Sequence, residues 1–261
     1  MSALLGSAHL GPTLAVTALA GLLTLPAGLD GPRAALVVAA VLTGQLTIGW
    51  SNDLVDVRRD RAVGRTDKPL ATGELSERLV RGCCAAALVA TAVLSLALGP
   101  AAGLLHLLLV AAGWAYNLGL KATALSWLPY AVAFGALPGV VWLAGPGSPP
   151  AWGVAAGALL GVGAHLANVL PDLGDDAATG VRGLPHRLGP RLLPVAAVAV
   201  LVAASAVIAL GAPGLPGWAL AVGAVLVVAL AGLALVRRGR DSFRAAVGIA
   251  LVDVALLVVA G

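Results

Sequence analysis

The sequence predicts an all-α, polytopic membrane protein, and three observations lead to this fold class. Of the 261 residues, 60% are hydrophobic and only 11% are charged, with a mean hydropathy of +0.99. No soluble domain of this size hides so much apolar surface in one core. The apolar residues also fall into nine runs separated by turn-forming glycines and prolines. We therefore expect a single membrane-embedded domain over residues 1–261.

Each run covers roughly 16 to 21 residues, which lets a helix cross about 30 Å of hydrocarbon. The nine expected transmembrane helices are Leu10–Leu29, Ala34–Trp50, Cys83–Leu98, Ala101–Leu118, Thr123–Leu143, Trp152–Leu170, Leu192–Leu210, Trp218–Val236 and Ser242–Ala260. The first run lacks the charged segment of a signal peptide, so we expect a retained helix. Four prolines, at positions 12, 26, 129 and 138, lie inside these runs, where neighbouring helices can satisfy the freed carbonyls.

The distribution of cations predicts the orientation in the membrane. Fifteen of the sixteen Lys and Arg residues lie in the connections after the second, fourth, sixth and eighth runs, and only Arg33 lies on the other side. Positive charge accumulates on the cytoplasmic side, so the N-terminus is expected inside and the C-terminus outside. In a bacterial cell this means the plasma membrane. The pI of about 9.7 therefore reflects a bilayer surface rather than a nucleic-acid partner.

An acidic cluster follows the second run. Asn52, Asp53, Asp56 and Asp60 are spaced so that, in a helix, the three carboxylates lie on one face. Carboxylates this close repel one another unless a cation neutralises them. Hard divalent ions such as Mg²⁺ take carboxylate oxygens and often share a substrate phosphate. The cluster therefore predicts a metal site or an unusually unstable segment.

A second acidic cluster follows the sixth run. Asn168, Asp172 and Asp176 recur at a spacing of four, with Asp175 beside them. Basic residues follow both clusters: Arg61, Arg65 and Lys68 after the first, and Arg182 and Arg187 after the second. Both clusters belong to the predicted cytoplasmic side. Two matched acidic clusters trailed by cations indicate a metal-bridged diphosphate.

These motifs resemble the signatures of the UbiA superfamily of intramembrane prenyltransferases. The first cluster matches the family's aspartate-rich signature, and the run from Arg65 to Gly73 is similar to its Arg-Thr-x-Arg-Pro-Leu-x-x-Gly element, with Lys68 where arginine is frequent. Tyr116 and Lys121 match a Tyr-x-x-x-x-Lys element. Asp172 and Asp176 match the second signature, where Val169 replaces an aspartate that many members carry. The resemblance covers nearly the whole chain.

The resemblance implies nine helices around a central cavity, capped on the cytoplasmic side by the two connections. It implies a Mg²⁺-dependent transferase that ionises an isoprenyl diphosphate and passes the prenyl group to a small aromatic or other electron-rich acceptor. The implied metal ligands are Asp53, Asp56, Asp60, Asp172 and Asp176. The implied diphosphate contacts are Arg61, Arg65, Lys68, Lys121 and Arg182. Tyr116 would orient the acceptor or help to remove its proton, and Asn52 and Asn168 would either orient the carboxylates or ligate the metal.

Two rival functions remain at this point. A terpene cyclase on the same scaffold would ionise the same diphosphate but let the cation close on its own double bonds. Such an enzyme needs aromatic faces to steer the cation, and an aromatic content of 4% favours intermolecular transfer. A cation channel or transporter would favour carboxylates at mid-membrane, whereas these clusters follow the apolar runs at one membrane face.

Overall fold

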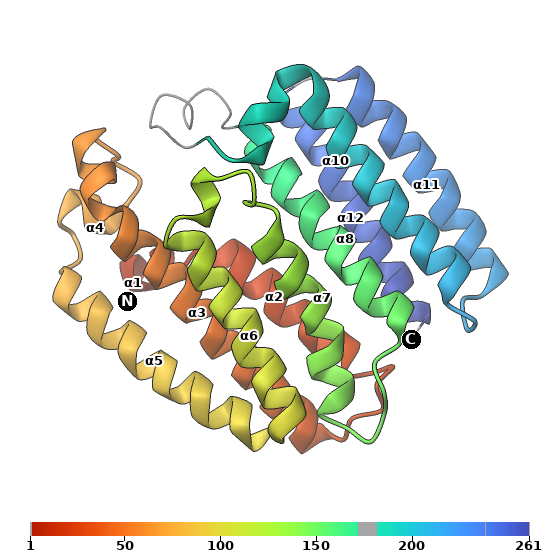
Figure 1. Ribbon diagram of the computed structural model, residues 1–261, viewed down its shortest axis with the longest axis horizontal. Coiled ribbons are helices and arrows are strands. Elements are labelled where there is room, and N and C mark those ends of the chain that lie inside the picture. The colour runs from red at the N-terminus through yellow and green to blue at the C-terminus, as the bar shows by residue number, and fades with distance from the viewer. Residues whose placement is uncertain (1, 172–181, 238, 261) are drawn as a thin grey trace.

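The structure, a computed structural model, describes residues 2–171, 182–237 and 239–260. Helices dominate it (Figure 1), and the described residues contain no strand. The elements are α1 (Ser2–Gly6), α2 (Leu10–Leu23), α3 (Gly31–Ala62), α4 (Pro69–Thr72), α5 (Glu77–Ala97), α6 (Pro100–Asn117), the 3-10 turn η1 (Leu120–Ala122), α7 (Leu128–Leu143), α8 (Ala151–Val169), α10 (Leu184–Gly211), α11 (Gly217–Val236) and α12 (Arg240–Ala260).

Each of the nine apolar runs contains a helix within the described residues, which confirms the all-helical prediction. Six of these helices, α3, α5, α8, α10, α11 and α12, have the length and mean hydropathy of a membrane span. The helices α2 and α7 are shorter, with 14 and 16 residues. Nine membrane crossings and the cytoplasmic caps therefore stay predictions.

The expected positions of the prolines need correction. Only Pro138 lies well inside its helix, since Pro129 occupies the first turn of α7, where its missing N–H is not needed. Pro12 is in the first turn of α2, and Pro26 follows the end of that helix. The helix α10 begins earlier than the apolar run does and is kinked at Gly189, whose φ of 69° suits glycine.

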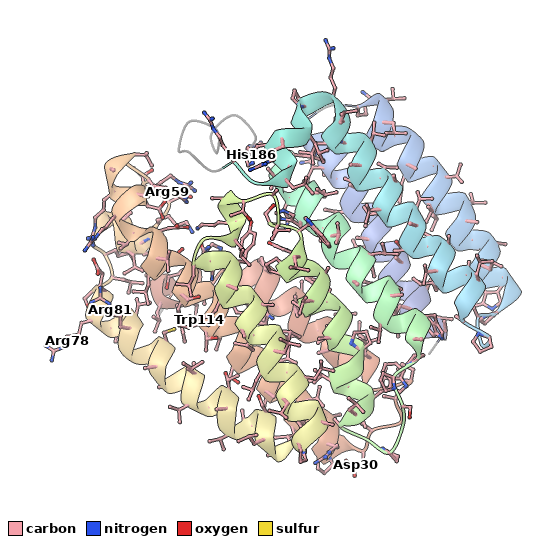
Figure 2. All side chains as sticks on the ribbon, in the orientation of Figure 1. Asp30, Arg59, Arg78, Arg81, Trp114 and His186 are labelled. Atoms are coloured by element: carbon pink, nitrogen blue, oxygen red, sulfur yellow. The ribbon has the colours of Figure 1, made fainter. Side chains whose placement is uncertain are left out.

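Helix α3 is much longer than its apolar run. It has 32 residues, where the sequence analysis placed its span only from Ala34 to Trp50. At 1.5 Å per residue it measures about 48 Å, against about 30 Å for a hydrocarbon core. Its last three turns therefore extend beyond the apolar run, and they carry the first acidic cluster. Figure 2 shows Asp30, the N-cap of α3, and Arg59, in its last turn, far apart at the two ends of the helix.

The helices pack into two groups (Figure 1). Helices α2, α3, α5, α6 and α7 form the first group and α8, α10, α11 and α12 the second, with α7 packed on α8 between them. The α7–α8 contact needs glycine: a Cβ at Gly157 would lie 2.5 Å from the carbonyl oxygen of Phe134, and one at Gly161 would lie 2.3 Å from that of Tyr130. Small residues allow such close backbone approach in membranes.

The outer surface of the helices is apolar, as a lipid-facing surface must be. On α11, Val225, Val228 and Val236 are 69%, 73% and 80% exposed. An exposed apolar surface that runs along a whole helix marks contact with a membrane or another protein. Together with the six long apolar helices, it agrees with an integral membrane protein.

Arg33, the one cation on the predicted outer side, is used for packing. Its Nε donates to the carbonyl oxygen of Ala144 at 2.6 Å, its Nη2 to Leu98 at 2.8 Å and its Nη1 to Ala97 at 3.3 Å. These carbonyls lie at the C-terminal ends of α5 and α7, where helix dipoles place negative charge. One guanidinium thus joins three helices, which explains an exception to the charge asymmetry.

Replacing Arg33 is expected to destabilise the protein. In Arg33→Met, three carbonyls lose their donor, which we expect to cost about 3 kcal/mol of unfolding free energy. Arg33→Lys should recover only part of this, because an ammonium cannot reproduce the planar fork. Thermal unfolding in one detergent, with Arg240→Met at an exposed position as control, measures the effect. Equal melting temperatures for Arg33→Met and Arg240→Met would contradict the role.

Candidate active site

The first acidic cluster lies on the last turns of α3, as the helical spacing predicts. The three carboxylates lie on the part of α3 that continues past its apolar run. They are nevertheless buried and largely out of contact with water. Asp53, Asp56 and Asp60 are only 1%, 8% and 4% exposed. Buried carboxylates need a proton, a cation or several hydrogen-bond donors. Their partners therefore define the site.

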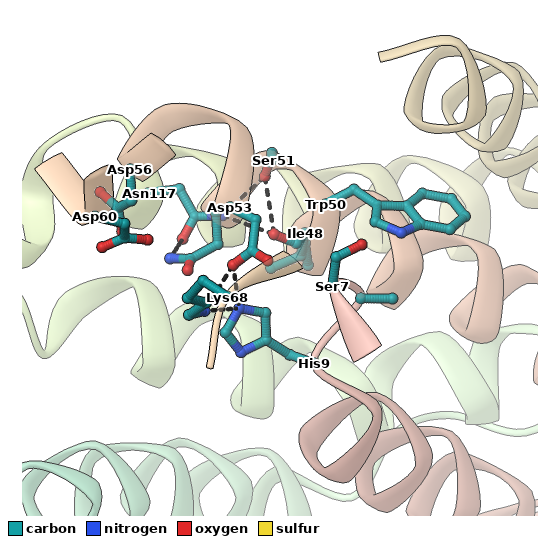
Figure 3. Close-up of polar contacts among 12 residues, drawn as sticks. Ser7, His9, Ile48, Trp50, Ser51, Asp53, Asp56, Asp60, Lys68 and Asn117 are labelled. Atoms are coloured by element: carbon teal, nitrogen blue, oxygen red, sulfur yellow. Dashed lines mark hydrogen bonds and ion pairs between the residues drawn. The ribbon is translucent and has the colours of Figure 1, made fainter. Parts of the chain in front are cut away.

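Asp53 pairs with two residues that are distant in sequence (Figure 3). Lys68 Nζ donates to Asp53 Oδ1 at 2.6 Å, and His9 Nε2 lies 2.9 Å from the same oxygen. The second carboxylate oxygen, Oδ2, is buried and has no hydrogen-bond partner among the described residues. A buried oxygen with unused lone pairs requires an explanation, and a bound ion is one.

Asp56 and Asp60 form the other part of the cluster and lie next to each other in Figure 3. Lys121 Nζ, from the turn η1, contacts both oxygens of Asp56 at 2.7 and 2.5 Å. Arg59 Nη2 lies 3.2 Å from Asp56 Oδ2, and its Nε lies 3.9 Å from Asp60 Oδ1. The lysine is 13% exposed, so this ion pair is largely shielded from water.

All three carboxylates were expected to converge, and in this structure they divide into two sets. Across the described part of the chain, no three His, Cys, Asp or Glu side chains gather closely enough to hold a metal ion. Lys68 neutralises Asp53, and Lys121 and Arg59 neutralise Asp56. The alternatives were a metal or an unstable cluster, and the structure adds a third: lysines from other elements and Arg59 of α3 itself supply the compensating charge.

The two asparagines of the site form a bridge between α3 and α6. Asn52 donates through Nδ2 to Asn117 Oδ1 at 3.0 Å. Asn117 in turn donates to the carbonyl oxygen of Ile48 and to Ser51 Oγ, both at 2.8 Å. This bridge fixes the end of α6 against α3. It thereby positions the loop that begins at Leu118 and carries Lys121 to Asp56.

The arginines of the first connection bind within that connection. Arg61 donates to Glu77 Oε1 at 2.8 Å and to the carbonyl oxygen of Leu70 at 3.1 Å. Arg65 makes a two-pronged contact with Asp67, both bonds at 2.7 Å. These hydrogen bonds lower the pKa of the Asp67 carboxyl to about 2, so the pair stays ionised at neutral pH. Contacts of Arg61 and Arg65 with a diphosphate stay predictions.

Tyr116 belongs to an aromatic cluster between α6, α7 and α8. Its ring lies edge-on to Tyr130 at 5.2 Å and to His165 at 5.7 Å, and Tyr130 stacks on Phe134 at 6.3 Å. Tyr130 hydrogen-bonds to Tyr116 and to Asn168. Both tyrosines of the chain and one of its two phenylalanines therefore gather in one place. Despite the low aromatic content, one region presents several ring faces.

The second acidic cluster is described only in part. Asp172 and Asp176 lie outside the described residues, while Asn168 lies in the last turn of α8 and Arg182 is exposed before α10. The base of this connection is anchored by Ser126, whose Oγ accepts from Leu184 N at 3.0 Å and pairs with His165 Nε2 at 3.0 Å. Ser126 therefore joins the loop of Lys121 to the start of α10.

Sequence reasoning missed four of these residues as parts of the site: His9, Arg59, Asn117 and Tyr130. Arg59 lies between two cluster aspartates, so its spacing was a usable signal. His9 is 44 positions from Asp53 and has no local motif.

The two surface hollows described, of about 460 Å³ along the start of α5 and about 420 Å³ between α11 and α12, lie away from the carboxylates of the site. The central cavity therefore stays a prediction.

These features define a class of protein: an all-helical integral membrane protein with buried, cation-paired carboxylates at one end of its helices. A profile of the UbiA prenyltransferase family matches residues 12–251. The chain therefore belongs to the UbiA prenyltransferase family, as its motifs predicted, and is an intramembrane enzyme of the prenyltransferase type. No curated protein matches it significantly in sequence.

Solved structures share the fold over nearly their whole length. The apo structure of a UbiA homolog from Aeropyrum pernix K1 is 24% identical, with a TM-score of 0.75, and the match covers 95% of this chain and 98% of that one. A structure from work on digeranylgeranylglyceryl phosphate synthase in membranes has a TM-score of 0.75 at 17% identity, covering 99% and 97%. A UbiA homolog from Archaeoglobus fulgidus bound to GPP and Mg²⁺ has a TM-score of 0.74 at 16% identity, covering 97% of each chain. At these identities, the likeness concerns the fold.

Proposed function

We propose that this protein is a Mg²⁺-dependent intramembrane prenyltransferase. It would ionise an isoprenyl diphosphate and transfer the prenyl group to a small aromatic or other electron-rich acceptor. One observation carries the proposal: buried Asp53 and Asp56 on α3 are each held by a lysine from a different connection at the same end of the molecule. That the UbiA homolog from Archaeoglobus fulgidus was solved with GPP and Mg²⁺ supports it.

The residues present fit a divalent cation. Asp53 Oδ2 has unused lone pairs among the described residues, and Asp56 and Asp60 lie side by side (Figure 3). Hard oxygen donors of this kind suit Mg²⁺, which keeps several waters and binds through carboxylates and substrate phosphates. We assign Asp53, Asp56 and Asp60 to one ion, around which the two sets of carboxylates would have to draw together, and Asp172 and Asp176 to a second. Bound Mg²⁺ would supply charge neutralisation on the diphosphate oxygens.

The lysines would act by changing partners. Lys68 and Lys121 now donate to carboxylates. With those carboxylates engaged by the cation, the ammonium groups are free to donate to the diphosphate as the bond between carbon and the bridging oxygen breaks. Arg61, Arg65 and Arg182 would contribute further donors. Asn52 and Asn168 would orient this assembly through their bonds to Asn117 and Tyr130.

The allylic cation must then meet its acceptor and not water. We assign Tyr116 to orient the acceptor or help remove its proton, because its ring lies in the aromatic cluster with Tyr130 and His165. Exclusion of water falls to the surrounding apolar helices. The distribution of cations supports an active site at the cytoplasmic side of the membrane and an N-terminus in the cytoplasm. Reporter fusions at each terminus test this topology, and a periplasmic N-terminus would contradict it.

The alternative is a terpene cyclase, and the aromatic cluster is the observation that favours it. Tyr116, Tyr130 and Phe134 gather their rings in one place, and aromatic faces stabilise a nearby carbocation. The decisive assay uses the purified protein in nanodiscs with geranyl, farnesyl or geranylgeranyl diphosphate. Mg²⁺ and an aromatic acceptor are each added or withheld, and products are analysed by mass spectrometry. Diphosphate release only with acceptor supports the transferase, and a cyclic hydrocarbon without acceptor supports the cyclase. No release under any condition contradicts both.

A further inference from the structure

The bend between α1 and α2 places one histidine in an unusual conformation. His9 has φ 53° and ψ 58°, and it is the one non-glycine residue with positive φ among the described residues. A left-handed residue other than glycine costs about 1–2 kcal/mol, so it persists only where the surrounding structure imposes it. The bend directs the His9 side chain toward Asp53 on α3 (Figure 3).

The bend is held in place without the help of His9. Trp50 Nε1 donates to the carbonyl oxygen of Leu4 at 3.1 Å, and Thr13 Oγ1 donates to that of Ala8 at 2.8 Å. A Cβ at Gly49 would lie 2.2 Å from the Ala8 carbonyl oxygen, so only glycine permits this contact. The N-terminal segment is thus fixed against α3 by packing and backbone contacts, which leaves the imidazole free for another task.

His9 contacts one of the two carboxylate oxygens of Asp53. His9 Nε2 and Lys68 Nζ both contact Oδ1, at 2.9 and 2.6 Å, and they lie 3.1 Å from each other. No described residue forms a hydrogen bond with Oδ2, which is buried. Two nitrogens on one oxygen fix the rotation of the carboxylate, so that Oδ2 faces a single direction.

We propose that His9 is a positioning residue for the metal: it holds Asp53 Oδ1 so that Oδ2 is presented to the divalent cation. The inference rests on the proposed function. With its proton on Nε2, His9 would also donate to Oδ1 when Lys68 moves to the diphosphate, because Nε2 lies 2.9 Å from that oxygen. Groups that orient a metal-ligating carboxylate generally contribute about 10- to 100-fold to metal affinity.

The test measures metal affinity without turnover. Mn²⁺ is titrated by electron paramagnetic resonance into the protein in nanodiscs, with geranyl S-thiolodiphosphate, a poorly ionising substrate analogue. His9→Ala removes the nitrogen, and His9→Gln retains a side-chain N–H of similar reach; both keep a Cβ and hence the strained backbone. Ser7→Ala is the matched control, because it removes a hydrogen bond to the Leu4 carbonyl oxygen in the same segment without touching the site.

We expect the Mn²⁺ dissociation constant to rise about tenfold in His9→Ala, with at least half of the loss in log affinity recovered in His9→Gln. Ser7→Ala should bind Mn²⁺ as the parent does. Parent-like affinity in His9→Ala overturns the proposal, as does an equal loss in Ser7→Ala, which would indicate a purely structural role. A parent protein that binds no Mn²⁺ with the analogue overturns the proposed function as well.

Discussion

Asp53→Asn is expected to lower kcat/KM by about 10³-fold, equivalent to about 4 kcal/mol of transition-state stabilisation. Asparagine has the same shape, so Lys68 and His9 keep an oxygen to contact, but it has no charge to hold a divalent cation. The change also leaves the shielded Lys68 ammonium without its counter-charge, so we expect a loss of stability beside the loss of activity. Steady-state kinetics in nanodiscs, with thermal unfolding of the same samples, separate the two effects.

The control for Asp53→Asn is Asp241→Asn. Asp241 is an exposed carboxylate in the first turn of α12, 3.5 Å from Arg244, and it belongs to neither cluster. It should retain the parent's kcat/KM, since exposed ion pairs contribute little. If Asp53→Asn kept more than a tenth of the parent's activity, the assignment of Asp53 to the metal would be wrong.

Lys121→Met should lower kcat/KM by about 10²-fold, the typical effect of removing one donor to a developing anionic charge. Methionine is unbranched and of similar length, so the stem of the side chain still fills its space. The variant also leaves Asp56 with Arg59 alone, 3.2 Å away. We expect this to cost about 2 kcal/mol of stability without metal, because losing one partner of a shielded pair leaves an uncompensated charge.

The size of the Mg²⁺ effect on the melting temperature distinguishes a lysine that shares the metal site from one with only a structural role. Lys121 and a cation compete for the same Asp56 oxygens, so Mg²⁺ should raise the melting temperature of Lys121→Met more than that of the parent. Arg78→Met, which removes an exposed cation from α5, should behave as the parent. Equal Mg²⁺ stabilisation of parent and Lys121→Met would show that lysine and metal do not share the carboxylate.

The helical fold was predictable because each apolar run is by itself long and hydrophobic enough to indicate a membrane helix. Trp218–Val236 and Ser242–Ala260 became α11 and α12 with few changes, since a long apolar segment in a bilayer must satisfy its backbone internally. Helix ends were less predictable. The run that ends at Trp50 continues as α3 to Ala62, because charged residues can extend a helix beyond the apolar part as well as end it.

By itself, the sequence determined the chain's class, its family and the face of α3 that carries Asp53, Asp56 and Asp60. Hydropathy and helical spacing are local properties, so they can be read along the chain. Only the tertiary structure decided which groups pair with which carboxylate: Lys68 and His9 meet Asp53, while Lys121 meets Asp56. His9 and Lys121 are 44 and 65 positions from their partners. Such pairings depend on how helices pack, and no local pattern encodes them.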